Sequence, residues 1–190
     1  IKKEGDSLKD SQMIDGIIVD KEVVNPVMPK EIKNAKIALV DHALEIVKTD
    51  FSAEIEIQNP DEMDQYLKQE DTIIKDLIDS LKNAGVNVVF CQKGIDEAAQ
   101  HYLVKNKIMA VRRVKHSDMK KLSRATGAKI VTDIRGMGPE DLGDAGHASE
   151  RKIGNDKMVF IENCPDPKAV TILVRGSSDQ VLDSGKTAME

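Results

Sequence analysis

Helix-forming and strand-forming patterns alternate between residues 60 and 132, and this alternation limits the fold more than any other feature of the sequence. Helical periodicity covers residues 60–84, 96–106 and 117–126. Each of these segments is followed by a short apolar run, at 86–91, 108–111 and 129–132. Strands separated by helices usually lie parallel in one sheet, with the helices as crossover connections. The sequence therefore predicts an α/β layer.

Further strand patterns lie on both sides of this layer. They cover residues 14–19, 23–24, 36–40, 54–57, 158–161 and 170–174, and a last helical pattern covers 179–189. These strands predict a second, antiparallel sheet, which gives mixed α+β layers. A chain of 190 residues suits a single domain, which we place at 1–190.

The helix predicted over 60–84 is unusually long and has well-defined ends. Asn59 is a favourable N-cap, Pro60 suits the first helical position, and Gly85 stops the helix. Twenty-five residues span about 37 Å at about 1.5 Å each, which exceeds the width of a small domain. The apolar stripe is complete only in the C-terminal half, at Ile74, Leu77, Ile78, Leu81 and Ala84. The polar N-terminal half is therefore expected to project past its own domain.

A small set of apolar residues falls on or before this projecting half. They are Phe51, Ile55 and Ile57 upstream of the helix, and Met63, Tyr66 and Leu67 within it. A cluster of apolar side chains on a protruding element is typical of a contact surface. We predict such a surface within residues 50–85.

Residues 101–125 carry eight Lys or Arg and one Asp, inside a chain whose formal net charge is −5. A basic segment of this kind suggests phosphate binding, so one alternative is a nucleic-acid-binding α/β module that uses residues 105–124. The other interpretation is a solvated helix face. Aromatic residues make up only 3% of the chain, which argues against a stacking platform for single-stranded nucleic acid.

No pattern of catalytic or metal-binding residues emerges. The Gly-rich stretch at 136–143 lacks the Lys-Ser/Thr end of a phosphate-binding loop, and the four His residues show no ligand spacing. We therefore expect no catalytic residue, no metal and no cofactor, and predict that the chain is not an enzyme. Cys91 and Cys164 are expected to be buried thiols in a reducing compartment, which predicts a cytoplasmic protein. No apolar run approaches a membrane span, no signal peptide is evident, and the two ends suggest a piece of a longer chain.

Several motifs follow one another along the chain in a specific order. They read VVFCQKGID at 88–96, IMAVRRVK at 108–115, ATGAKIV at 125–131, PEDLG at 139–143 and KAVTILVRG at 168–176. In this order they resemble the apical domain of group II chaperonins, the archaeal thermosomes and the eukaryotic TRiC/CCT complex, most closely a thermosome subunit. One departure is Val27, where the family pattern usually has Gly before Met28-Pro29.

The resemblance implies a β-sandwich flanked by helices, with a helical protrusion at 50–85 that serves as a built-in lid. It implies that ATP and Mg²⁺ are bound by an equatorial domain, which is absent here together with the intermediate domain. The implied partners are unfolded or partly folded proteins and neighbouring subunits of a double ring, with no membrane. The family's client-binding helix matches Ser117 to Thr126, where we expect Lys120, Lys121 and Arg124 to face the chamber.

Overall fold

The computed structural model describes residues 1–4, 10–45, 60–165 and 170–177, together with Leu182 and Thr187. Its strands form a nine-stranded sheet in the order β1-β9-β2-β8-β7-β3-β4-β5, with β6 also paired to β3. The strands are β1 (Lys2–Glu4), β2 (Gln12–Val19), β3 (Glu31–Val40), β4 (Val88–Cys91), β5 (Met109–Val111), β6 (Ile130–Val131), β7 (Gly143–Ile153), β8 (Asp156–Glu162) and β9 (Val170–Gly176). The helices are α1 (Pro60–Asn83), α2 (Glu97–Lys105) and α3 (His116–Thr126), with a 3-10 turn at Pro139–Asp141.

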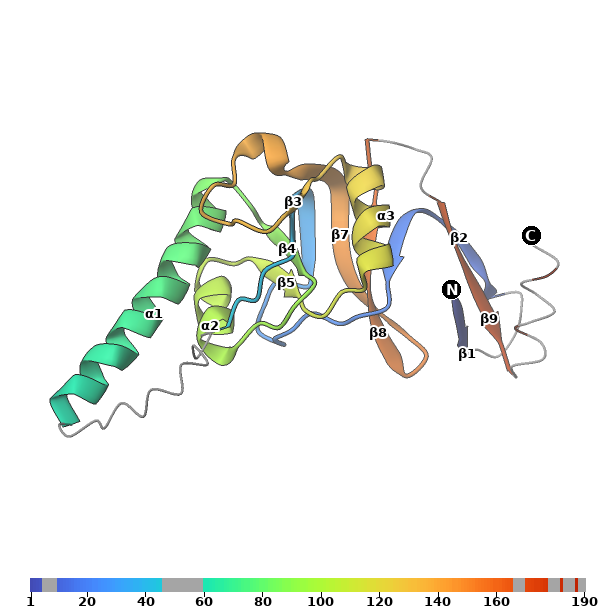
Figure 1. The fold of residues 1–190 in the computed structure, drawn as a ribbon. Coiled ribbons are helices and arrows are strands. Elements are labelled where there is room, and N and C mark those ends of the chain that lie inside the picture. The colour runs from blue at the N-terminus through green and yellow to red at the C-terminus, as the bar shows by residue number, and fades with distance from the viewer. Residues whose placement is uncertain (5–9, 46–59, 166–169, 178–181, 183–186, 188–190) are drawn as a thin grey trace.

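The predicted α/β layer is confirmed. Strand β3 pairs in parallel with β4 on one edge and with β6 on the other, and β4 pairs in parallel with β5. Parallel crossovers are right-handed, and the step from β5 to β6 runs against the direction of the first two steps, so α3 covers the opposite face from α1 and α2. Figure 1 shows α1 and α2 on one side of β3, β4 and β5, and α3 on the other.

The flanking strands join this layer, so the expected second sheet is part of a single curled sheet. Strands β7 and β8 pair antiparallel, β7 continues onto the first part of β3, and β2 pairs antiparallel with both β8 and β9. The fold is thus the expected mix of α and β layers, with the antiparallel strands continuous with the parallel ones.

Two apolar clusters form the core. The larger one includes buried residues of β3, β4, β5 and all three helices, with Phe90 and Leu39 among its fully buried members. The smaller one lies where β2, β8 and β9 meet, and contains Ile14, Ile18, Met158, Phe160 and Leu173. Because aromatic residues are scarce, aliphatic side chains fill most of both clusters.

Some boundaries differ from the prediction. Strand β3 begins at Glu31, five residues before the predicted start at residue 36, and β1 and β7 have no counterpart among the predicted strands. Val23 and Val24 do not extend β2; Val24 instead donates a backbone hydrogen bond to Ala110 in β5. The strand predicted at 54–57 lies outside the described residues. Of the last predicted helix, only Leu182 and Thr187 are described, and both are helical.

Candidate functional site

Helix α3 is amphipathic and well terminated. It follows Lys115, whose backbone is extended, and it ends at Gly127, whose φ of 79° is the left-handed conformation that glycine adopts without strain. Met119 and Leu122 are buried. The Thr126 hydroxyl donates to the Leu122 carbonyl at 2.7 Å, which satisfies the one buried polar side chain of the helix.

The opposite face of α3 carries the three predicted contact residues. Lys120, Lys121 and Arg124 are all exposed. Lys121 forms an ion pair with Asp118 at 3.4 Å, while Lys120 and Arg124 have no ion-pair partner among the described residues. The arrangement is a solvent-facing cationic surface on a helix that is otherwise anchored in the core. Exposed single charges of this kind are screened by water, so the attraction that each exerts on an anionic group is weak.

Close packing beneath α3 fixes its position on β7. A Cβ atom added at Gly143 would lie 2.4 Å from the Thr126 Oγ1 and 2.8 Å from the Ala128 Cβ. These distances are well inside van der Waals contact, so only glycine allows the helix to approach the strand this closely. The exposed face of α3 is thereby held at a defined orientation to the sheet.

Helix α1 is attached to the domain by its C-terminal half. Ile74, Leu77, Ile78 and Leu81 are buried there, as predicted. The hydroxyl of Tyr102 in α2 donates a 2.7 Å hydrogen bond to the Asp71 Oδ2, one turn before the first of these residues. In Figure 1 the earlier turns of α1 extend away from α2 and the sheet.

Most of the apolar contact residues predicted in the segment 50–85 are not described by the structure. Phe51, Ile55 and Ile57 lie outside the described residues. Met63, Tyr66 and Leu67 lie in the described backbone of α1, and their side chains are not described. Within the described half of the helix, Ile73 is an apolar residue that remains 49% exposed. The predicted contact surface therefore stays a prediction.

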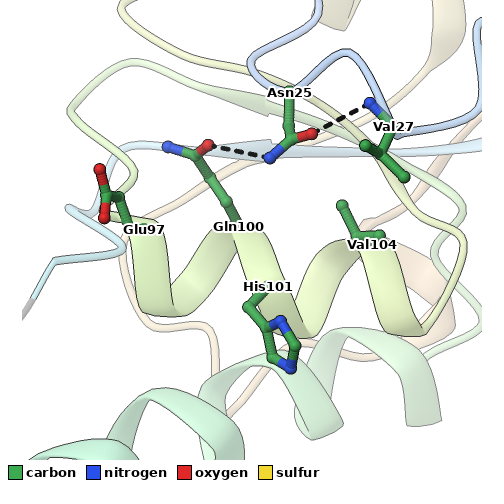
Figure 2. Close-up of a pocket in the computed structure, with 6 residues that line it drawn as sticks. All are labelled: Asn25, Val27, Glu97, Gln100, His101 and Val104. Atoms are coloured by element: carbon green, nitrogen blue, oxygen red, sulfur yellow. Dashed lines mark hydrogen bonds between the residues drawn. The ribbon is translucent and has the colours of Figure 1, made fainter.

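A hollow beside α2 was not predicted from the sequence. It has a volume of about 410 Å³ and is lined by Asn25, Val27, Glu97, Gln100, His101 and Val104. Figure 2 shows the side chains of Val27 and Val104 at one end, and Glu97 at the other. The Val27 side chain is 74% exposed. The Val27 backbone N–H donates a hydrogen bond to the Asn25 side chain at 3.0 Å, which holds this loop in place. The departure of Val27 from the family pattern was the only sequence signal at this place.

The two thiols sit in environments that suppress their ionisation. Cys91 is buried and Cys164 is half-buried. Burial raises the pKa of each thiol to about 11. At neutral pH both remain protonated, which is typical of structural cysteines.

No group of three or more His, Cys, Asp or Glu side chains within the described residues is placed to hold a metal ion. Nor is any helix in this part of the chain long and apolar enough to cross a membrane.

Comparison with known proteins gives consistent matches. The sequence profile of the TCP-1/cpn60 chaperonin family matches residues 1–190. A thermosome subunit beta from Thermococcus kodakarensis is 53% identical over 189 residues, and a thermosome subunit from Pyrococcus horikoshii is 54% identical over 189. These alignments cover 100% of this chain but only 35% and 34% of the relatives, so the chain spans about a third of their length.

A solved structure agrees with the sequence matches. The open-state monomer of a group II chaperonin from Methanococcoides burtonii superposes with a TM-score of 0.79 at 39% identity, over 100% of this chain and 41% of that one. Its relatives of known type are thermosome subunits and a group II chaperonin. The chain therefore belongs to the TCP-1/cpn60 chaperonin family, and within it the chain is similar to the group II members.

Proposed function

We propose that residues 1–190 are the apical domain of an ATP-dependent group II chaperonin, which binds unfolded or partly folded proteins and helps to enclose them. Residues 50–85 are the helical protrusion that contributes to a lid. ATP and Mg²⁺ binding and ATP hydrolysis belong to equatorial parts of a longer subunit, which assembles with neighbours into a double ring in the cytoplasm. The relatives' names and the threefold greater length of those proteins support this assignment.

The direction of α1 is the observation that carries the proposal. Among the described side chains of the helix, the buried ones lie at or after Ile74, and Figure 1 shows the earlier turns extending away from α2 and the sheet. The helical backbone at 60–70 continues for about 16 Å before Asp71, given about 1.5 Å per residue. A helix extended in this way from a rigid base is suited to reach a neighbouring subunit or a client. Its few apolar residues, among many acids, favour weak and reversible contacts.

Two other surfaces are suited to a client. The face with Lys120, Lys121 and Arg124 offers cationic groups on a rigid helix. The hollow beside α2 joins an apolar end, at Val27 and Val104, to polar groups. An unfolded chain exposes both apolar and acidic segments, so contacts of both kinds contribute to its capture.

The test is suppression of aggregation of an unfolded protein by the purified chain. Three variants separate the surfaces: Ile55→Asp with Leu67→Asp, Val27→Asp, and Lys120→Glu with Lys121→Glu and Arg124→Glu. We expect each to weaken suppression several-fold, while Lys75→Glu, a charge reversal on the exposed side of the anchored half of α1, leaves it unchanged. Unchanged suppression by all three variants would contradict the proposal.

A second candidate function, nucleic-acid binding, is favoured by one observation. Lys105, Lys107, Arg112, Arg113, Lys115, Lys120 and Arg124 are exposed and form no ion pair among the described residues. Binding through these charges predicts retention on immobilised DNA that falls steeply with salt, because each neutralised phosphate releases counterions. Retention that is absent or insensitive to salt removes this candidate.

A further inference from the structure

The ribbon formed by β9 and residues 12–15 of β2 carries apolar side chains on both of its faces. The inner face holds Ile14 and Leu173, which are buried in the smaller apolar cluster. The outer face holds Met13, Val170 and Ile172, which are 76%, 50% and 37% exposed. A strand with one solvated face alternates apolar and polar residues, whereas a strand covered on both faces reads as a nearly continuous apolar run, as VTILV does in β9. The ribbon therefore has the sequence of a layer that is covered on both sides.

The three outer residues form one patch. Met13 is the direct register partner of Ile172, and Val170 lies two residues before Ile172 on the same face. Side chains in these positions are near neighbours across the strand pair. They are three of the six large apolar side chains that are exposed in the described residues, so the exposure is concentrated on this ribbon. Val174, two residues after Ile172, is buried, so the same face is covered at one end and open at the other.

The first and last strands of the described chain meet at this ribbon. Strand β1 pairs in parallel with β9, and the Ile1 amine donates a 2.8 Å hydrogen bond to the Ile172 carbonyl. Figure 1 shows β1, β9 and the first half of β2 at the end of the molecule opposite α1. The thermosome relatives are about threefold longer than this chain. Whichever end of residues 1–190 the additional chain of such a subunit joins, it reaches the domain through β1 or β9.

We propose that the outer face of this ribbon, at Met13, Val170 and Ile172, is covered by an amphipathic helix from the part of a longer subunit that lies outside residues 1–190. Two paired strands lie about 5 Å apart and a helix is about 10 Å wide, so one helix covers the ribbon. The helix that fits presents a stripe of apolar residues spaced three and four apart to Met13 and Ile172. The inference rests on the proposed assignment to a longer subunit, and it does not depend on which surfaces bind a client.

Oxidation of Met13 by dilute hydrogen peroxide tests this contact, because a methionine is converted to its sulfoxide only where the reagent reaches the sulfur. In the chain of residues 1–190 Met13 should be oxidised rapidly, and in the longer subunit about tenfold more slowly, as mass spectrometry of the peptides would show. Met119, which is buried in α3, should react slowly in both proteins. Equal oxidation of Met13 in the two proteins would overturn the inference.

The same measurement separates this contact from client binding. Unchanged suppression of aggregation by the three surface variants would contradict the proposed function and leave the protection of Met13 in the longer subunit intact. Protection of Met13 that arises only after an unfolded protein is added would make the ribbon a client surface, and would overturn the inference.

A double variant gives a second measurement. Met13→Lys with Ile172→Lys places two charges on an exposed face, so hydrogen exchange of the β2 and β9 amides should change little in the chain of residues 1–190. In the longer subunit the same charges would lie under the helix, and exchange of these amides should rise several-fold. Gln12→Lys, at an exposed position on the other face of β2, is the matched control and should leave exchange unchanged in both proteins. An equal effect of the double variant in the two proteins would count against the helix.

Discussion

Tyr102 in α2 donates its hydroxyl proton to the Oδ2 atom of Asp71 in α1 at 2.7 Å. This hydrogen bond raises the pKa of Tyr102 above its ordinary value. Asp71 lies one turn before Ile74, the first buried residue in the described part of α1. The bond therefore marks the base from which the earlier turns of the helix extend, and it connects α1 to a helix of the α/β layer.

Loss of this bond should loosen the base of α1 without unfolding the domain. We expect Tyr102→Phe to increase hydrogen exchange of the backbone amides around residues 69–73 several-fold, because local opening no longer has to break a side-chain contact. Amides after Ile78, in the turns that the buried Ile78 and Leu81 hold against the core, should be unaffected. Asp76→Asn serves as the control, because it removes one carboxylate charge at an exposed position of the same helix. Equal protection in Tyr102→Phe and the parent chain would show that the bond does not anchor α1.

The close approach of α3 to β7 predicts a marked sensitivity at Gly143. Gly143→Ala places a Cβ 2.4 Å from the Thr126 Oγ1, so the helix or the strand must shift. Overpacking of this kind typically costs about 1–3 kcal/mol in the free energy of unfolding, measurable by urea denaturation. Gly136→Ala is the matched control, because its nearest neighbour is the Asp133 carboxylate at 3.1 Å, a side-chain end that can move. Thr126→Ala should relieve part of the cost when combined with Gly143→Ala, and strict additivity would contradict the packing argument.

The periodicity of apolar residues predicted the helices and strands that bury a regular apolar stripe. It did not predict β7, whose position depends on close packing against a helix that lies elsewhere in the sequence. The helix predicted at 60–84 is observed at Pro60–Asn83, because capping residues and the apolar stripe both define it. Strand β7 was missed because its sequence, GDAGHASERKI, has few of the β-branched or aromatic residues that signal a strand. Glycine at position 143 allows α3 and the residues after it to pack closely against β7. This requirement comes from tertiary packing, so the sequence alone does not reveal it.

The same division holds for the candidate site. The expectation that Lys120, Lys121 and Arg124 lie on an open face of α3 followed from the resemblance of this helix to the family's client-binding helix. The hollow beside α2 did not, since it joins the loop at Asn25 and Val27 to a helix more than seventy residues later. Local patterns carry no information about which loop a helix face meets.

Both thiols should react slowly in the folded chain. With a pKa of about 11, the thiolate fraction of Cys91 and Cys164 at pH 8 is about a hundredfold lower than for a thiol with the ordinary pKa of 9.0. We expect iodoacetamide at pH 8 to leave Cys91 unmodified and to label Cys164 slowly, because Cys164 is only half-buried. In urea both should label rapidly, as mass spectrometry of the peptides would show. Rapid labelling of Cys91 in the folded chain would contradict its assignment as a buried structural thiol.

The turn before β7 should lose stability in acid. The ammonium of Lys129 donates to the Asp141 Oδ1 at 2.8 Å, and the Gly138 N–H donates to Oδ2 at 3.1 Å. The Lys129 bond first, and the Gly138 bond second, hold the pKa of Asp141 below its ordinary value of 3.8. A carboxyl group with a lowered pKa in the folded state stabilises the fold above its ordinary pKa, and this stabilisation is lost as the pH falls through the lowered value.

Asp141→Asn tests this linkage because it keeps an oxygen for the Gly138 N–H and removes the charge that Lys129 needs. The variant should melt below the parent chain at pH 5, and the gap should close as the pH falls below 3.8, when the parent carboxyl also becomes neutral. Glu140→Gln, at the exposed neighbouring position, should melt close to the parent chain throughout. A gap that stays constant from pH 5 to pH 2.5 would mean that the Asp141 charge does not stabilise the turn, and that shape alone holds Lys129 and Gly138 in place.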